Sequence, residues 1–114
     1  MRLQYNELEN GIRLINLIGA LDLSGSYSIE VEFVRHCAGD NVRVLVDLSE
    51  VDYISSIGVQ MLVNAANSIT SRGGKMALLG PQPSVLDVLD LTGILQVISI
   101  YSDLDSAKAG VLAE

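Results

Sequence analysis

Strand-like and helix-like segments alternate along almost the whole chain. Residues 42–48 form a nearly continuous apolar run that is rich in β-branched side chains, as is typical of a buried strand. The segment after it carries apolar residues at helical spacing and ends at the pair Gly73-Gly74. The residues of that helical face are Val59, Leu62, Val63, Ala66 and Ile69. This alternation predicts an α/β fold with right-handed crossovers and a largely parallel sheet.

The N-terminal part of the chain predicts a β-hairpin followed by a helix. Asn10-Gly11 is a favoured turn pair, so we expect paired strands near residues 2–8 and 12–18. The second strand is apolar on both faces, as expected where both faces of a sheet are covered. A helix then follows Leu21-Asp22-Leu23-Ser24 and ends near Gly39. Its apolar positions form two neighbouring stripes: Ile29, Phe33 and Cys37 in one, and Tyr27, Val31 and Val34 in the other.

The C-terminal part continues the alternation. Residues 76–79 predict a short buried strand, and a helix follows in which Pro83 stands in the first turn and Gly93 ends the apolar pattern. The apolar positions of that helix are Val85, Val88 and Leu89. Residues 96–100 predict a last strand. Ser102 and Asp105 resemble a capping box for a final helix that carries Leu104, Ala107 and Val111.

Length and charge limit the partners that this chain is expected to have. Its 114 residues suit a single domain over residues 1–114. A net charge of -7 disfavours nucleic acid and anionic lipid surfaces. No apolar run reaches the length of about 18 residues that a membrane span needs, and the N-terminus does not resemble a signal peptide. Cys37 is the only cysteine, which suits a reducing cytoplasm, the expected location.

Patterns typical of catalysis or metal binding are missing from the sequence. His36 is the only histidine, and its neighbour Cys37 points about 100° away from it on a helix. We therefore expect a histidine at the rim and a small buried thiol. The run Gly73-Gly74-Lys75-Met76 follows a helix and opens a strand, whereas a phosphate loop follows a strand and opens a helix. The sequence therefore predicts a protein that is not an enzyme and uses no metal or cofactor.

Two serines, Ser55 and Ser56, stand where the second helix is expected to begin. Serine is a preferred N-cap, and a cap contributes about 1 kcal/mol of stability. One helix needs one cap, and Val59 rather than Glu or Gln stands three residues after Ser56, so no capping box is formed. Gly58 costs about 1 kcal/mol of helix propensity relative to Ala. We expect this small residue to keep the backbone beside the serines accessible to another protein.

The stretch from Val42 to Gly58, and within it DLSEVDYISSIG over Asp47–Gly58, resembles the signature of STAS domains, the anti-sigma-factor antagonists. The similarity continues through residues 19–24, 74–80 and 88–94, so it covers nearly the whole chain. It implies a STAS-like mixed β-sheet, built from an N-terminal hairpin and then βαβα units. About four helices are expected to pack mainly on one face of that sheet.

The resemblance also implies a partner and a modification. Members of the family bind an anti-sigma factor that is also a serine-protein kinase, which uses ATP to phosphorylate a serine at the start of the second helix. The unphosphorylated form binds and frees the sigma factor, the phosphorylated form lets go, and a phosphoserine phosphatase resets the switch. By position the phosphoacceptor is Ser56, with Ser55 as the alternative. The partner-binding positions implied in this way are Asp22, Ser24, Asp52, Ser55, Ile57 and Gly58.

Two residues depart from the family's pattern. Ser55 stands where many members have Asp, and Ile57 stands where a small residue is usual. A bulky side chain beside the hydroxyl favours a second interpretation: a non-phosphorylated STAS scaffold, or a small subunit of a signalling or lipid-transport complex. An enzyme such as a nucleotide hydrolase is the third and least favoured interpretation, because no phosphate loop and no evident base is present.

Overall fold

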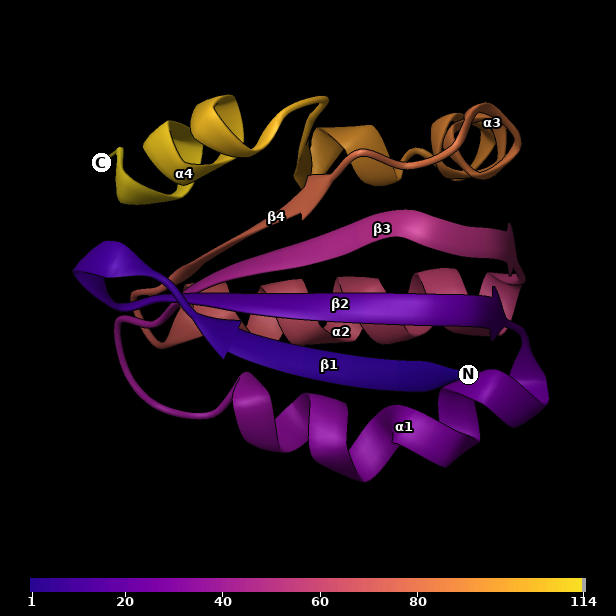
Figure 1. Cartoon of the computed structure of the whole chain (residues 1–114), viewed down its shortest axis with the longest axis horizontal. Helices are drawn as coiled ribbons and strands as arrows, with labels where there is room; N and C mark the ends of the chain where they lie inside the picture. The colour runs from indigo at the N-terminus through magenta and orange to yellow at the C-terminus, as the bar shows by residue number, and fades with distance from the viewer. Residues whose placement is uncertain (114) are drawn as a thin grey trace.

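The computed structural model describes residues 1–113 and contains one five-stranded sheet (Figure 1). The strands follow one another across the sheet in sequence order. They are β1 (Arg2–Glu7), β2 (Ile12–Leu21), β3 (Arg43–Ile54), β4 (Lys75–Leu79) and β5 (Ser99–Tyr101). β1 and β2 pair antiparallel, and all other neighbours pair parallel. The predicted mixed sheet with an N-terminal hairpin is confirmed.

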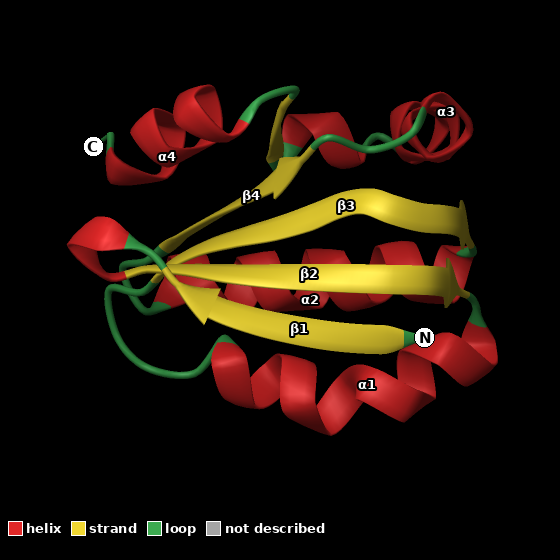
Figure 2. Ribbon diagram, in the orientation of Figure 1, coloured by secondary structure: helices red, strands yellow, loops and turns green. Residues whose placement is uncertain are grey.

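Within residues 1–113, four α-helices pack on this sheet (Figure 2). They are α1 (Leu23–His36), α2 (Ser56–Ser71), α3 (Pro83–Thr92) and α4 (Leu104–Leu112). The larger hydrophobic core joins one face of the sheet to the first three helices, through Phe33, Leu62 and Leu89 among others. The smaller core lies on the opposite face, where Ala107 and Val111 of α4 pack with strand residues. The helices therefore lie mainly on one face, as the family resemblance implied.

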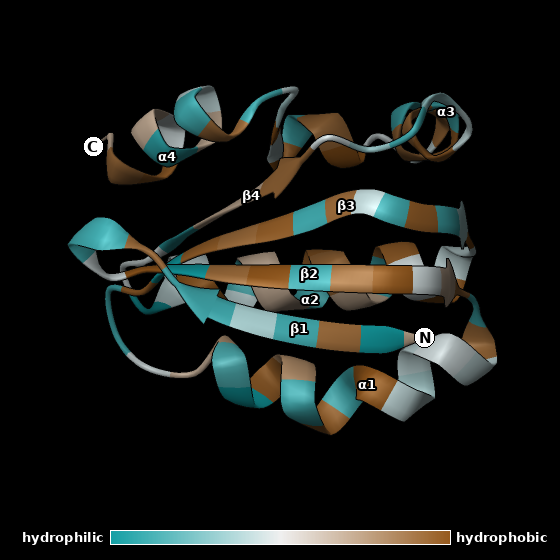
Figure 3. Cartoon of the chain, viewed as in Figure 1, coloured by the Kyte–Doolittle hydropathy of each residue, from teal (hydrophilic) through white to brown (hydrophobic). Residues whose placement is uncertain are grey.

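The parallel strands are apolar on both faces because helices cover both sides of the sheet. Figure 3 shows β4 and most of β2 in the brown of hydrophobic residues. In β2, Ile15 and Leu17 belong to the larger core, whereas Ile12 belongs to the smaller core. The two-sided apolar pattern predicted for this strand is therefore confirmed.

The hairpin turn is longer than the Asn-Gly pair alone. Residues Glu9–Gly11 form a short 3-10 turn, and the Leu8 N–H donates to the Ile12 carbonyl at 2.8 Å. Asn10 and Gly11 both adopt positive φ, at 63° and 72°, which these residue types tolerate best. The pair was therefore a correct turn signal, but it is part of a three-residue loop and not a two-residue turn.

The two apolar stripes of α1 have different surroundings. Ile29, Phe33 and Cys37 are buried in the larger core, as expected from their spacing of four. The neighbouring stripe faces solvent instead: Tyr27 is 69% exposed, Val31 80% and Val34 57%. The reason is that the sheet contacts only one side of the helix, so a second apolar stripe has no surface to pack against.

Three boundaries also differ from the sequence prediction. β3 does not stop at residue 48 but continues to Ile54, because its second half still pairs with the end of β2. The last strand covers only Ser99–Tyr101, and residues 94–96 form a 3-10 turn. Asp103, not Ser102, caps α4, since its carboxylate accepts from the Ser106 N–H at 2.8 Å. Leu104 is exposed at the first position of this helix, whereas Ala107 and Val111 are buried.

The helix boundaries in the middle of the chain follow their local signals. α2 ends before Gly73, which has a φ of 80°. α3 begins at Pro83 and ends at Gly93, which has a φ of 77°. Both glycines sit in the left-handed conformation that terminates helices. Among the described residues, no helix combines the length and the apolar character that a membrane crossing requires.

Candidate functional site at the start of two helices

The carboxyl ends of β2 and β3 lie side by side, and a helix begins from each of them. Leu21, the last residue of β2, pairs with Ile54, the last residue of β3. α1 starts two residues after Leu21 and α2 two residues after Ile54. The pairing therefore brings residues 22–24 and 55–58, which are far apart in the sequence, to the same end of the sheet.

Ser55 is the N-cap of α2 and is fully used in that role. Its hydroxyl donates to the Leu21 carbonyl at 3.2 Å and accepts from the Gly58 N–H at 3.3 Å. Its backbone N–H donates to the same Leu21 carbonyl at 3.1 Å. The hydroxyl therefore satisfies one of the free N–H groups of the helix and also ties the helix to β2.

Ser56 occupies the first position of α2 and is exposed. Within residues 1–113, no partner forms a hydrogen bond with its hydroxyl, unlike the hydroxyl of Ser55. A side chain at this position projects from the first turn of the helix, where free N–H groups make the local field positive. Of the two adjacent serines, Ser56 is therefore the one whose oxygen is available for chemistry.

Asp22 caps α1 in the same manner. Its carboxylate accepts a hydrogen bond at 2.7 Å from the N–H of Gly25, which follows it by three residues. Ser55 accepts in the same way from Gly58, which also follows it by three residues. The two helices therefore begin with the same cap-x-x-Gly arrangement. The family resemblance placed Asp22 near the serines at the end of β2, and the structure does bring it to that end.

Gly58 is needed for close packing rather than for access. It is buried, and a Cβ atom there would lie 2.5 Å from the Leu21 carbonyl oxygen and 2.8 Å from Leu21 Cγ. Gly25 is equally restricted, since its Cβ would lie 2.1 Å from the Ala20 carbonyl oxygen. The expectation that Gly58 exposes backbone to a partner is corrected: the missing side chain lets α2 approach the end of β2.

The other residues expected at this surface are exposed. Ser24 lies in the first turn of α1, and Asp52 lies near the end of β3. Ile57 follows Ser56 and is 46% exposed. Tyr53, at 56% exposed, is a residue that the sequence analysis missed. The signal that could have found it is a large aromatic residue with polar neighbours at the end of a strand, because aromatic residues are enriched in interfaces.

Charge is unevenly distributed along the molecule. The end of the sheet where α1 and α2 begin carries Asp22, Glu50 and Asp52, and none of these carboxylates forms an ion pair within the described residues. Several cations gather at the opposite end, where the parallel strands begin and α2 ends. They are Arg13, Arg43, Arg72 and Lys75. Arg2, which pairs with Ile18, lies at the same end as these carboxylates, and Glu7 lies beside Arg13 at the other, so the two ends differ in the proportion of each charge. The carboxylates at the Ser56 end suit an electropositive partner.

The single histidine and the single cysteine of the sequence both pack against the fold. His36 stacks on Tyr5 with ring centroids 4.0 Å apart, so it packs at the rim of the sheet, as predicted. Burial raises the pKa of the Cys37 thiol to about 11, so the thiol stays protonated at neutral pH. No group of three or more His, Cys, Asp or Glu residues in the part of the chain that the structure describes could hold a metal ion.

Comparison with known proteins agrees with the fold. The sequence profile of the STAS domain matches residues 6–107. The anti-sigma F factor antagonist of Paenibacillus polymyxa is 25% identical over 109 residues, which cover 90% of each chain. An anti-sigma-factor antagonist (STAS) domain protein from Planctomyces limnophilus has a TM-score of 0.85 at 21% identity, covering 97% of this chain and 98% of that one. The Bacillus cell fate determinant SpoIIAA in its phosphorylated form has a TM-score of 0.68 at 16% identity, covering 96% of this chain and 99% of that one.

Proposed function

Because the chain belongs to the STAS domain family, we propose that it is an anti-sigma-factor antagonist controlled by phosphorylation of Ser56. Its partner is an anti-sigma factor that is also an ATP-dependent serine-protein kinase, and a phosphoserine phosphatase resets the switch. The unphosphorylated protein binds the anti-sigma factor and so frees a sigma factor for transcription. The relative from Paenibacillus polymyxa, which carries the name of such an antagonist, supports the proposal.

The observation that carries the proposal is the difference between Ser55 and Ser56. Ser55 has both a hydrogen-bond donor and a hydrogen-bond acceptor role within the fold, so its modification would break the cap of α2. Ser56 is exposed and has no such role. In the transfer, Ser56 Oγ forms a bond to the γ-phosphorus of ATP, the bond from that phosphorus to ADP breaks, and a base on the kinase takes the hydroxyl proton.

A phosphate on Ser56 is compatible with the fold. It adds about −1.5 to −2 charges at pH 7. At the first turn of α2 these charges meet free N–H groups and the positive end of the helix dipole. The switch therefore acts through the partner interface and not through unfolding.

The interface would lose affinity for reasons of shape and desolvation. Ser56 is followed directly by the exposed Ile57, so a partner that packs on this side chain covers the hydroxyl as well. A dianionic group at such a contact must be desolvated and needs room that a hydroxyl does not. A loss of about 3 kcal/mol lowers affinity more than a hundredfold.

The decisive experiment is intact-mass spectrometry after incubation with ATP and lysate of the source cells. We expect the gain of one phosphate by the wild-type protein and by Ser55→Ala, and no gain by Ser56→Ala. Phosphate on Ser56→Ala would move the acceptor to another residue. A failure of the wild-type protein to gain phosphate, with the kinase active on a control substrate, would exclude the switch.

A second candidate function is favoured by Ile57. Its side chain is 46% exposed directly after Ser56, where it restricts the approach of a kinase. In that case the same surface holds a constitutive partner, and the protein is a scaffold or a small subunit of a signalling or lipid-transport complex. Stable co-purification with other subunits, without any phosphate on the protein, would identify this function. Ile57→Ala tests whether this side chain restricts the kinase, because the variant removes its bulk and keeps Ser56.

A further inference from the structure

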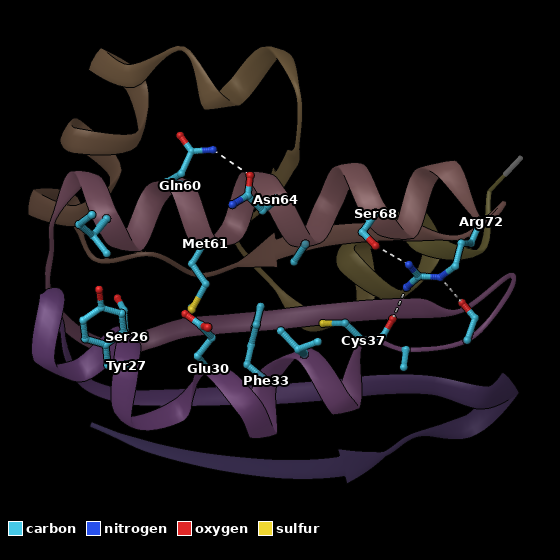
Figure 4. A pocket seen from close by; sticks show the side chains of 15 residues that line it. Ser26, Tyr27, Glu30, Phe33, Cys37, Gln60, Met61, Asn64, Ser68 and Arg72 are labelled. Atoms are coloured by element: carbon cyan, nitrogen blue, oxygen red, sulfur yellow. Dashed lines mark hydrogen bonds between the residues drawn. The ribbon is translucent and has the colours of Figure 1, made fainter.

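A groove of about 680 Å³ runs between α1 and α2 (Figure 4). The two helices run in the same direction, because each follows one of two parallel strands. Phe33 and Cys37, which line the groove, are almost completely buried. Arg72 lies at the far end, where its guanidinium donates to the carbonyls of Gly39 at 2.8 Å and Cys37 at 2.9 Å and also contacts Ser68. The groove is therefore closed at one end by a fixed side chain.

The walls of the groove continue into exposed apolar surface. Tyr27 and Val34 on α1 and Ile57 on α2 line the groove, and they are 69%, 57% and 46% exposed. On the outer side of α1, Leu23 and Val31 extend the same stripe, at 51% and 80% exposed. Contiguous apolar surface of this kind marks an interaction site on a soluble protein. A small molecule confined to the groove would leave the outer part of this stripe in water.

The dimensions of the groove fit a short helix. On α2 its lining extends from Ile57 to Ser68, which is about 17 Å, or three helical turns, at about 1.5 Å per residue. A partner helix laid between two parallel helices presents side chains at i, i+3, i+4 and i+7 to a groove of this type. The walls supply apolar partners for them, since Tyr27, Val34, Ile57 and Met61 all line the groove.

The lining of the groove carries one carboxylate, Glu30, and one guanidinium, that of Arg72, which is bonded to carbonyls at the far end. Glu30 lines the groove, is exposed and has no ion pair within residues 1–113. Asp22 and Asp52 lie near the starts of α1 and α2 and are likewise without an ion pair there. The α2 wall carries amides instead, and Gln60 donates to Asn64 at 2.9 Å. A helix with basic side chains along its borders is the complement of this surface.

We infer that the groove between α1 and α2 is the docking site of a basic amphipathic helix from a partner protein. Its apolar face packs against Tyr27, Val34, Ile57 and Met61, and its basic border lies over Glu30. The inference goes beyond the proposed function, because docking in the groove does not require phosphate on Ser56. Docking in the groove gives the partner a second contact, separate from Ser56, and this contact orients the bound partner.

The test uses a defined peptide as the probe. It is a 14-residue peptide, with leucines at i, i+3, i+4 and i+7 and lysines along both borders of that face. A matched peptide carries glutamates in place of the lysines, and another carries a central proline that breaks the helix. Fluorescence anisotropy measures affinity, and amide chemical-shift mapping of the full chain locates the peptide. We expect the basic peptide to bind at least tenfold more tightly than either control and to shift amides of α1 and α2.

Two variants of the protein decide whether the groove is the site. Val34→Lys places a positive charge on the exposed groove wall, where it repels a basic peptide, and Leu91→Lys places the same charge on α3, where Leu91 is 87% exposed and does not line the groove. We expect Val34→Lys to lower the affinity for the basic peptide at least tenfold and Leu91→Lys to leave that affinity unchanged. Both replaced side chains are exposed, so thermal melting of the two variants should match the wild type.

The outcomes separate the groove from the phosphorylation switch. Equal affinity of the three peptides, equal effects of the two variants, or shifts confined to other elements would overturn docking in the groove. Each of these results would leave phosphorylation of Ser56 unaffected, since that is measured by mass. Binding of the basic peptide by a protein that gains no phosphate would support the groove and exclude the switch.

Discussion

Ser55 and Leu21 are joined by two hydrogen bonds to one carbonyl. The Leu21 oxygen accepts from the Ser55 N–H at 3.1 Å and from the Ser55 hydroxyl at 3.2 Å. Since Leu21 ends β2 and Ser55 caps α2, this pair fixes the start of the second helix against the neighbouring strand. The adjacent Ser56 has no part in it. The fold therefore separates a serine that caps the helix from one that is exposed.

Ser55→Ala should destabilise the protein, and Ser56→Ala should not. The first change removes a helix cap, which typically costs about 1 kcal/mol, although the backbone N–H still reaches Leu21. The second removes an exposed hydroxyl, for which a change within about 0.5 kcal/mol is usual. Urea unfolding of both variants measures the difference. A greater loss in Ser56→Ala would show that the helix is capped differently in solution.

Ser56→Asp should weaken partner binding while melting near the wild-type temperature. A negative charge at the first turn of α2 is favourable for the helix, so the fold tolerates it. The same charge disturbs the contact that the partner makes beside Ile57. Binding to the anti-sigma factor is measured by isothermal calorimetry, and Ser56→Ala, which keeps binding, is the control. A large drop in melting temperature would instead identify Ser56 as a structural residue.

Gly58→Ala should destabilise the protein, although helix propensity alone predicts the opposite sign. Ala is favoured over Gly by about 1 kcal/mol inside a helix. In this structure the added Cβ would lie 2.5 Å from the Leu21 carbonyl oxygen, which already accepts two hydrogen bonds. Such overpacking costs about 1–3 kcal/mol. Chemical denaturation gives the sign directly, and a more stable variant would contradict the close packing described above.

Helix α4 should detach before the sheet unfolds as the pH falls. The hydrogen bond from Lys108 lowers the pKa of Glu9 from its usual 4.5. The N–H and hydroxyl of Ser106 lower the pKa of Asp103 from its usual 3.8. A carboxyl whose folded pKa is depressed stabilises above its unfolded pKa, and this stabilisation is lost as the pH falls through the folded value. Both carboxyl groups stabilise the position of α4: Asp103 caps the helix, and Glu9 pairs with Lys108 of the helix.

Hydrogen exchange followed between pH 5 and pH 2 would check this order. We expect amides of α4 to lose protection below about pH 4, the range where unperturbed Asp and Glu titrate, before those of β2 and β3. Asp103→Asn is the matched variant, because it removes the titrating cap and should reduce the pH dependence. Simultaneous loss of protection in α4 and the sheet would contradict the prediction.

Cys37 should resist alkylation until the protein unfolds. Burial raises the pKa of its thiol to about 11, and the side chain is 4% exposed. Only about one part in a thousand is therefore thiolate at pH 8, and the thiolate is the reactive form. Iodoacetamide labelling followed by mass spectrometry should be slow in buffer and fast in urea. Rapid labelling of the native protein would show that the groove opens to Cys37.

Much of the fold was predictable because its signals are local. The spacing of Ile29, Phe33 and Cys37 indicates a helix face, and Pro83 and Gly93 mark both ends of α3. Such signals come from residues that are neighbours on one turn of helix or one strand. The two consecutive serines, Ser55 and Ser56, were also a local signal, and they correctly placed the start of α2.

The burial of individual side chains was less predictable. The sequence offers two apolar stripes on α1, and nothing in their spacing shows that Tyr27, Val31 and Val34 face solvent. In the same way, Ser55 and Ser56 are equivalent as local cap candidates. Only the pairing of β2 with β3 brings the Leu21 carbonyl to Ser55. The interpretation of Gly58 as an accessible position failed for the same reason, since its neighbour Leu21 is distant in sequence.

The sequence by itself therefore determined the order of strands and helices, most of their ends and the family to which the chain belongs. These depend on hydrophobic period and on turn and cap residues, which act over a few positions. The tertiary structure decided which serine caps α2 and which is exposed, why a side chain at position 58 does not fit, and where α1 and α2 leave an apolar groove. Those features depend on contacts between segments such as Leu21 and Ser55, which only the pairing of β2 with β3 brings together.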